Sequence, residues 1–391
     1  NNTDYTFVDD SDVFDITRLF LSARKKYRTS FDLSKIIDTR ERRRVIGDYI
    51  ISVPDIYNHR TYPDTISYHM SNYDSHIYLF TNPYFTVQNP YALDVYPISA
   101  EVPLRALLPK GLENILVIGL GTSAQRDAIP LCRMQACLQN QGYAVGLLSA
   151  DAVRQSKRYR EFDLRPLQEE LVKMGNLPES VLKNEDNYPP SREKIRDAVD
   201  TIVDGFKGFE VVAWNLEEAL PLLREKLRTV RREDKLNYAV VLADYGYADG
   251  WEVIRDAVDS YDDWDAGWFK RPGYGTLTYL DMLVVVLGRC KKVESLPSIH
   301  RLAKNLNLNS AFSHYLAIAD ACETIKSPLS APVLYELLNM PGIMGYAVTN
   351  YKEAIFIFIP DEQTEKLDNR HISDQRIRTF KELFLARALY R

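Results

Sequence analysis

The chain has 391 residues, a net charge of -5 and 46% hydrophobic residues, which is enough apolar material for the cores of two or three domains. No extended basic stripe runs along the sequence, since the RERRR run at 40–44 is short and bracketed by acidic residues, so we expect no nucleic-acid partner. No apolar run approaches the roughly 18 residues that a transmembrane helix needs, and we expect no membrane span.

The four cysteines lack CxxC spacing, and each lies in an apolar helical pattern. They are Cys132, Cys137, Cys290 and Cys322. A small thiol in such a pattern is usually buried, so the spacing predicts neither disulfides nor a zinc site, and no other metal site is expected.

In chain order, the first predicted element is a helix at Ser11–Arg28, with Ser11 as its N-cap. Strands are predicted at Asp48–Val53 and Ser75–Thr81. Between and beside them the sequence is rich in tyrosine and histidine: Tyr57, Tyr62, Tyr68, Tyr73, Tyr78, His59, His69 and His76. These side chains would form either a layer that faces a substrate or a packed, half-buried surface.

The most informative stretch is Asn114–Gly146. The aliphatic run at Ile115–Ile118 predicts a strand buried on both faces of a parallel sheet, and Gly119 and Gly121 open a loop after it. A helical pattern rich in small residues follows from Leu131 to about Val153. Unpaired N–H groups and the positive end of the helix dipole make such a helix start suitable for an anion or a negatively charged ring.

A short helix is predicted at Asp163–Met174, with Gly175 as its stop. The polar, proline-containing segment Asn184–Ser191 then marks a domain boundary. We therefore divide the chain into residues 1–188 and residues 189–391.

The second part reads as a series of helices in pairs. The predicted helices are Leu216–Val230 with Tyr238–Asp249, Trp251–Ser260, Leu277–Cys290 with Leu296–Leu306, Phe312–Ile325 with Ala331–Asn339, and Arg376–Tyr390. The spacing suits stacked two-helix repeats of the HEAT type, and an irregular helical bundle is the alternative. The AIFIFI run at Ala354–Ile359 is β-prone and predicts an inserted strand.

Three motifs resemble the FAD-dependent oxidoreductases that are distantly similar to succinate dehydrogenase and fumarate reductase flavoproteins. LRALLPKGLENILVIGL at Leu104–Leu120 resembles the family's "yRsLLPkgvdNLLvaGR", and RMQACLQNQGYAVG from Arg133 resembles "RvmptcmatGqAaG". Upstream, DTRERRRVIGDYIIS at Asp38–Ser52, then Asp64 and Asp74-Ser75-His76, resemble "RetRrivGdyxL…D…DiH". The resemblance covers about residues 31–182.

The resemblance implies an α/β fold for the first part: the second half of a glutathione-reductase-type FAD-binding fold with a cap region, followed by an all-α domain. Such a fold holds the FAD pyrophosphate on a strand-GxGxxG-helix unit, and no such fingerprint occurs in this sequence. We therefore expect a partner, either an N-terminal FAD-binding segment or a separate subunit, that completes the site.

The resemblance also implies the residues at the cofactor. The FAD ring would be contacted by Gly119, Gly121, Thr122, Ser123, Arg133, Met134 and Gln135. Alternatively, Arg133 would form a salt bridge at the start of the helix instead of contacting the flavin.

Two departures from the family lie in the loop: Leu120 replaces an arginine, and Arg126 stands where relatives often carry a histidine. His76 or Arg126 would then be the catalytic group, with Arg126 clamping an anionic substrate. The expected activity is hydride transfer between a small polar substrate and FAD. The alternative is a non-catalytic scaffold subunit whose flavoprotein half has degenerated.

Overall fold

The computed structural model describes residues 44–71, 73, 82–88, 98–266, 277–347 and 374–391, together with Phe14, Thr17, Leu21 and Lys25. These four single residues are helical, in agreement with the predicted helix Ser11–Arg28, most of which lies outside the described residues. The predicted strands Ser75–Thr81 and Ala354–Ile359 also lie outside them.

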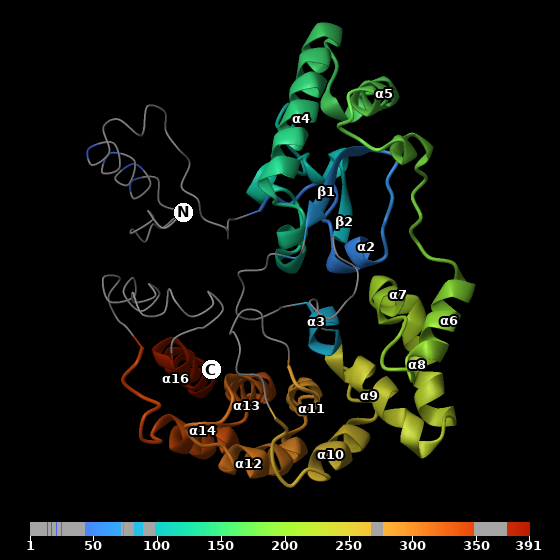
Figure 1. Ribbon diagram of the computed structural model, residues 1–391. Helices are drawn as coiled ribbons and strands as arrows, with labels where there is room; N and C mark the ends of the chain where they lie inside the picture. Colours follow the sequence, from blue (N-terminus) through green and yellow to red (C-terminus); the bar gives the residue numbers. More distant parts are fainter. Residues whose placement is uncertain are drawn as a thin grey trace.

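The first part of the chain combines a small sheet with a long helix (Figure 1). Its elements are α2 (Val53–Tyr57), β1 (Thr65–Ser71), α3 (Tyr84–Val87), β2 (Ile98–Pro103), α4 (Gln135–Gln155) and α5 (Arg165–Lys173), with 3₁₀ helices η1 (Leu104–Ala106), η2 (Gly119–Gly121), η3 (Arg126–Leu131), η4 (Tyr159–Glu161) and η5 (Glu179–Lys183). Strands β1 and β2 are antiparallel, with Tyr68 opposite Glu101 and a bulge between Thr65 and Ser67. Helix α4 packs on β1.

Two of the predicted strands are wrong. Residues 115–118 are irregular, and Ile115 is 46% exposed rather than buried on both faces. The 48–53 stretch forms one isolated bridge, from Ile51 to Ala124, and Gly47 just before it forms another to Pro109. A strand requires a neighbour to complete its hydrogen-bond ladder, and the described residues provide these stretches with single contacts only.

The second part of the chain is all helix. Its elements are α6 (Arg192–Thr201), α7 (Phe209–Trp214), α8 (Leu216–Thr229), α9 (Lys235–Asp244), α10 (Trp251–Asp259), α11 (Tyr279–Arg289), α12 (Leu296–Lys304), α13 (Phe312–Ile325), α14 (Ala331–Leu338) and α16 (Asp374–Tyr390), with η6 (Arg232–Asp234), η7 (Val293–Ser295) and η8 (Pro328–Ser330). The helices predicted from Leu216 onward are confirmed, with ends that differ by up to five residues. Helix α5 confirms the predicted helix before Gly175, whose φ is +75°.

The helices of the second part form two rows in an arc (Figure 1). Helices α9, α11, α13 and α16 contact one another in sequence along the inner row, and α10, α12 and α14 follow one another along the outer row. Between the rows, α14 packs on α16, α10 packs equally on α9 and α11, and α12 packs on α13, while α8 packs on α9. The predicted pairing of 216–230 with 238–249 is confirmed by the contact between α8 and α9. The predicted pairings of 277–290 with 296–306 and of 312–325 with 331–339 are wrong, because α11 packs mainly on α13 and α14 packs mainly on α16.

The centre of the second part is the contact between α11 and α13. Every residue of α11 from Leu280 to Gly288 is buried, as are most of those in α13. A Cβ atom added to Gly288 would lie 2.5 Å from the Cα of Ala321, so only glycine allows the two helices to approach this closely.

The two parts of the chain share one continuous apolar core. Helix α3 reaches from the first part to α7, α9 and α11. There Tyr84 stacks on Phe209 with a centroid distance of 5.6 Å, and the Gln88 side chain donates to the Phe206 carbonyl. The division at Asn184–Ser191 stays a prediction, since the composition changes there while the core runs on.

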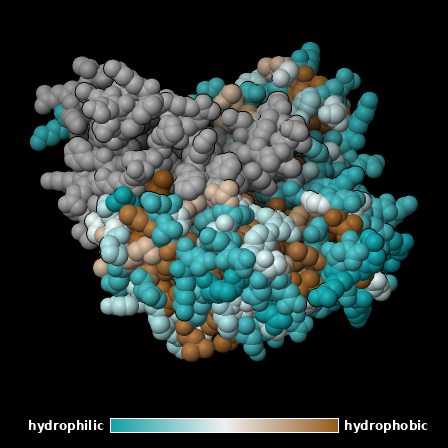
Figure 2. All heavy atoms as spheres, turned by 60° about the horizontal axis from the view of Figure 1, so that its bottom comes forward, coloured by the Kyte–Doolittle hydropathy of each residue, from teal (hydrophilic) through white to brown (hydrophobic). Residues whose placement is uncertain are grey.

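The outward face of the helical arc is mostly hydrophilic and carries small, separate hydrophobic areas (Figure 2). Exposed apolar side chains of the outer row include Leu329 and Tyr335. No helix within the described ranges is both long enough and apolar enough to cross a membrane.

Candidate functional site

The loop that follows residue 118 is anchored to the first described segment through Ser123. The side chain of Ser123 is completely buried, and its Oγ accepts a hydrogen bond of 2.9 Å from the backbone N–H of Gly47. A Cβ atom on Gly47 would lie 2.8 Å from the Cβ of Ser123. Glycine at 47 and serine at 123 therefore fit each other, which explains physically why both occur in the motifs.

The turn at η2 lies against the first turns of α4. Gly119 has a φ of +72°, a conformation that favours glycine, and its N–H donates to Gln141 Oε1 of α4 at 3.0 Å. A Cβ atom on Gly121 would approach Val117 Cγ1 to 2.8 Å. Thr122 follows, with a buried Oγ1 that has no hydrogen-bond partner among the described residues.

A buried polar chain continues from Gln141 into the sheet. Gln141 Nε2 donates to Ser67 Oγ at 3.1 Å, and Ser67 Oγ lies 3.0 Å from His69 Nε2. Since Ser67 accepts from Gln141, its hydroxyl can donate to His69. Burial lowers the pKa of His69 to about 4, so the ring is neutral at pH 7.

Helix α4 begins at Gln135, four residues later than the predicted start, because Pro130 and its neighbours form the 3₁₀ helix η3. Arg133 is 8% exposed, Met134 is half-buried, and Gln135 is exposed. Met134 is the N-cap residue, and its side chain does not cap the helix. The N–H groups of residues 135–137 have no acceptor among the described residues.

The start of α4 therefore offers hydrogen-bond donors to a ligand that carries acceptor atoms. The exposed N–H groups point out of the first turn, and the helix dipole adds positive potential there. The negative charge that develops near N1 and C2=O of a reduced flavin would suit this position, so the residues present fit the ring end of FAD.

Of the two predicted catalytic residues, the structure describes Arg126 but not His76. Arg126 is the first residue of η3, is about one-third exposed, and lies 3.8 Å from the Asp127 carboxylate. Asp127 is buried and accepts from the Asn82 N–H at 2.6 Å. His76 lies outside the described residues.

A second cluster of polar residues lies away from this loop, and no motif in the sequence pointed to it. The Asp55 carboxylate, only 3% exposed, accepts hydrogen bonds from the Tyr49 hydroxyl, Arg60 and Trp214 Nε1. Arg60 also forms a two-pronged ion pair with Asp186, at 3.0 and 3.1 Å. These bonds join the first part of the chain to the linker and to α7.

The comparison with protein families finds a match in the first part of the chain. Residues 13–171 match the model of the FAD dependent oxidoreductase family. The match covers less than half of the chain and includes η2, η3, the start of α4 and the buried polar chain of Gln141, Ser67 and His69. It supports oxidoreductase chemistry for this part, and the cofactor that the family implies is FAD.

No curated protein matches the chain. No solved structure matches it either.

Proposed function

We propose that the first part of the chain forms the flavin-ring and substrate side of a FAD-dependent oxidoreductase, distantly similar to succinate dehydrogenase and fumarate reductase flavoproteins. The observation that carries this is the exposed, uncapped start of α4 beside the η2 turn, within the segment that matches the family. When bound, FAD would exchange a hydride with a small polar substrate.

In this proposal each predicted residue has a position in the site. Gly119 and Gly121 let the backbone of η2 lie close to the ring, while Thr122 presents a buried hydroxyl that has no hydrogen-bond partner among the described residues. Ser123 keeps the loop fixed to Gly47. Arg133, Met134 and Gln135 bring positive potential and N–H donors to the charged edge of the ring.

As the catalytic group we propose His76 or Arg126, as the sequence suggested. An arginine remains charged at all relevant pH values, so Arg126 would orient an anionic substrate rather than exchange a proton with it. The proton would then be carried by His76. The substitution of Arg126 to Lys keeps the charge but loses the planar fork, and we expect it to raise KM more than it lowers kcat.

We also propose that the ADP end of FAD is bound outside these 391 residues, by another segment or a subunit. The spacing of Gly119-Leu120-Gly121 does not match GxGxxG, and the turn is followed by a 3₁₀ helix. The chain alone should then retain little FAD through gel filtration. A yellow, stoichiometric complex would show that this proposal is wrong.

A matched pair of glutamines tests the ring site. Gln135 and Gln139 are both exposed on α4, one turn apart, and only Gln135 lies at the helix start. In a flavin-fluorescence titration, we expect Gln135→Ala to weaken FAD binding by about threefold to tenfold, the effect of one hydrogen bond. Gln139→Ala should leave the affinity unchanged, and equal effects of the two variants would refute the placement.

For the second part we propose stacked helical repeats of the HEAT type, supported by the two rows of helices. The two parts could instead form a non-catalytic scaffold subunit, and the replacement of the family's loop histidine by Arg126 favours this alternative. FAD binding without turnover of any small polar substrate would support it.

A further inference from the structure

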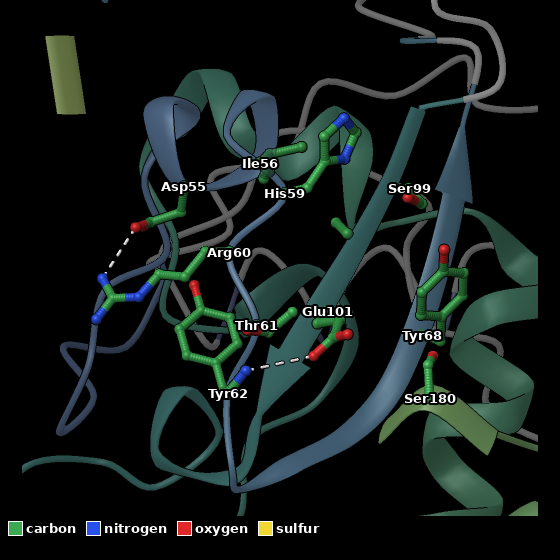
Figure 3. A pocket seen from close by; sticks show the side chains of 11 residues that line it. Asp55, Ile56, His59, Arg60, Thr61, Tyr62, Tyr68, Ser99, Glu101 and Ser180 are labelled. Atoms are coloured by element: carbon green, nitrogen blue, oxygen red, sulfur yellow. Dashed lines mark hydrogen bonds and ion pairs between the residues drawn. The ribbon is translucent and has the colours of Figure 1, made fainter. Parts of the chain in front are cut away.

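A small cavity lies on the side of the β1–β2 sheet opposite the η2 turn. Side chains alternate along a strand, so Ser67 and His69 face Gln141 of α4, while Tyr68 and its partner Glu101 face the other way. The cavity on that other side has a volume of about 130 Å³ and is lined by Ile56, His59, Tyr68, Ser99, Glu101 and Ser180, among others (Figure 3). The β1–β2 sheet separates it from the proposed flavin site.

Glu101 is held in place through only one of its carboxylate oxygens. Its Oε2 accepts from Thr65 Oγ1 and Asn184 Nδ2, each at 2.6 Å, and from the Tyr62 N–H at 3.4 Å. Its Oε1 accepts no hydrogen bond from the described residues. The carboxylate is thus fixed in orientation while one oxygen remains available to the cavity.

The charges around the cavity favour a cation. Arg60 also lines it, but its guanidinium is committed to Asp55 and Asp186. Asp186 also pairs with Arg105, which in turn pairs with Asp64, so three carboxylates face two arginines, and Glu101 adds a further negative charge. Burial raises the pKa of Glu101, and a cation in the cavity would oppose that rise by stabilising the ionised carboxylate.

Volume and lining limit the size and chemistry of the ligand. An engineered apolar cavity of about 150 Å³ holds a benzene molecule, so a cavity of this size accepts about six non-hydrogen atoms. Hydroxyl groups come from Ser99, Tyr68 and Ser180, and the mouth is open at the exposed side chains of His59 and Ser180. A short molecule with a hydroxyl or similar polar group beside the cation would satisfy these groups.

We propose that this cavity binds a protonated primary amine on a short chain, with the ammonium group on Glu101. Two sources share this chemistry: a free amino alcohol, and the lysine side chain of a peptide. A free amine would fit entirely inside, whereas a lysine side chain would enter through the mouth between His59 and Ser180.

Saturation-transfer NMR on the full chain tests the proposal with ethanolamine and with Nα-acetyl-lysine amide as the two probes. Acetate, similar in size and negatively charged, is the control ligand. We expect transfer to at least one amine and none to acetate, and the amine that gives the stronger signal identifies the source. Absence of transfer to both amines, or equal transfer to acetate, would overturn the proposal.

Two variants locate the binding. Glu101→Gln keeps an acceptor oxygen for Thr65 and Asn184 but removes the charge, and it should weaken amine binding at least about tenfold. Glu169→Gln, at an exposed position on α5, should leave binding unchanged. Ser180→Phe, which blocks the mouth from an exposed position, should also abolish binding and does not depend on how Glu101→Gln folds. Binding that survives both Glu101→Gln and Ser180→Phe would place the amine elsewhere.

Discussion

Asp55 is a single buried carboxylate on which much of the stability of the fold depends. It accepts from four residues, Tyr49, Ser52, Arg60 and Trp214, and lies almost entirely out of contact with solvent. Asp55→Ala leaves Arg60, whose side chain is 9% exposed, with half of its ion pairs. We expect a loss of about 3–5 kcal/mol in the free energy of unfolding, measured by urea denaturation.

The matched control is Asp151→Ala, which breaks an ion pair with Arg154 on the surface of α4, where the arginine side chain is 68% exposed. Such exposed pairs contribute about 0–1 kcal/mol. Equal losses for the two variants would contradict the structural role of Asp55.

The buried imidazole of His69 predicts a pH dependence of stability. Its pKa is lowered from 6.5 to about 4 by burial, so the unfolded chain binds a proton more readily than the folded chain does. The contribution of His69 to the free energy of unfolding is fully present above pH 6.5 and is lost as the pH falls toward 4. The stability difference between the wild type and His69→Gln should shrink by about 3 kcal/mol between pH 7 and pH 4.

Urea unfolding of both proteins at several pH values measures this difference, and the subtraction cancels the groups that they share. His59→Gln, at an exposed position, is the control variant. A difference between wild type and His69→Gln that stays constant with pH would show that His69 is not a buried neutral ring.

At the scale of elements, the helices from α8 onward were predictable from the sequence, whereas β1 and β2 were not. The apolar periodicity of α8 to α14 comes from one buried face per helix, which the sequence shows directly. In β1 the pattern is inverted: Ser67 and His69 are buried while Met70 is 48% exposed. Because polar contacts with Gln141 stabilise that buried face, the usual alternation of apolar and polar residues gave no signal.

The sequence likewise predicted only those parts of the candidate sites whose residues are close together in the chain. The motifs located η2 and the start of α4, because their residues are adjacent in sequence and shared with the family. Asp55, Arg60 and Asp186 come together only after the linker has folded back, across a separation of 126 residues between Arg60 and Asp186. No local pattern reports such a contact.

Alanine substitution is expected to have opposite effects on stability at two glycines, of which only Gly288 lies at the close contact between α11 and α13. Gly288→Ala would force a methyl group into the backbone of Ala321, and we expect it to cost about 1–3 kcal/mol. Gly146→Ala lies inside α4, where an added Cβ meets nothing within 4 Å, and it should stabilise by about 0.4–1 kcal/mol. Thermal unfolding distinguishes them, and a neutral Gly288→Ala would refute the close approach of the two helices.

At the scale of the whole molecule, the linker at Asn184–Ser191 is held by side chains of the first part. Asp186 pairs with Arg60 and with Arg105, and Asn184 donates to Glu101. The two parts also share one apolar core, so cleavage between them requires local release of the linker.

Limited proteolysis measures this release. We expect the wild type to be cut near residues 184–191 before the helices on either side are cut, and Asp186→Ala to be cut there several times faster. Asp200→Ala, which removes an exposed ion pair with Lys226, is the control. Cleavage at other loops first, in both proteins, would place the boundary elsewhere.

The central claim is that the flavin ring lies between the η2 turn and the start of α4. Hydrogen–deuterium exchange of the full chain, with and without saturating FAD, tests it most directly. The claim predicts slower exchange in peptides that cover residues 119–123 and 133–138, which include the N–H groups of residues 135–137 that have no acceptor among the described residues, and no change in α11 or α13. Unchanged exchange in both peptides, with protection found only in other segments, would contradict it.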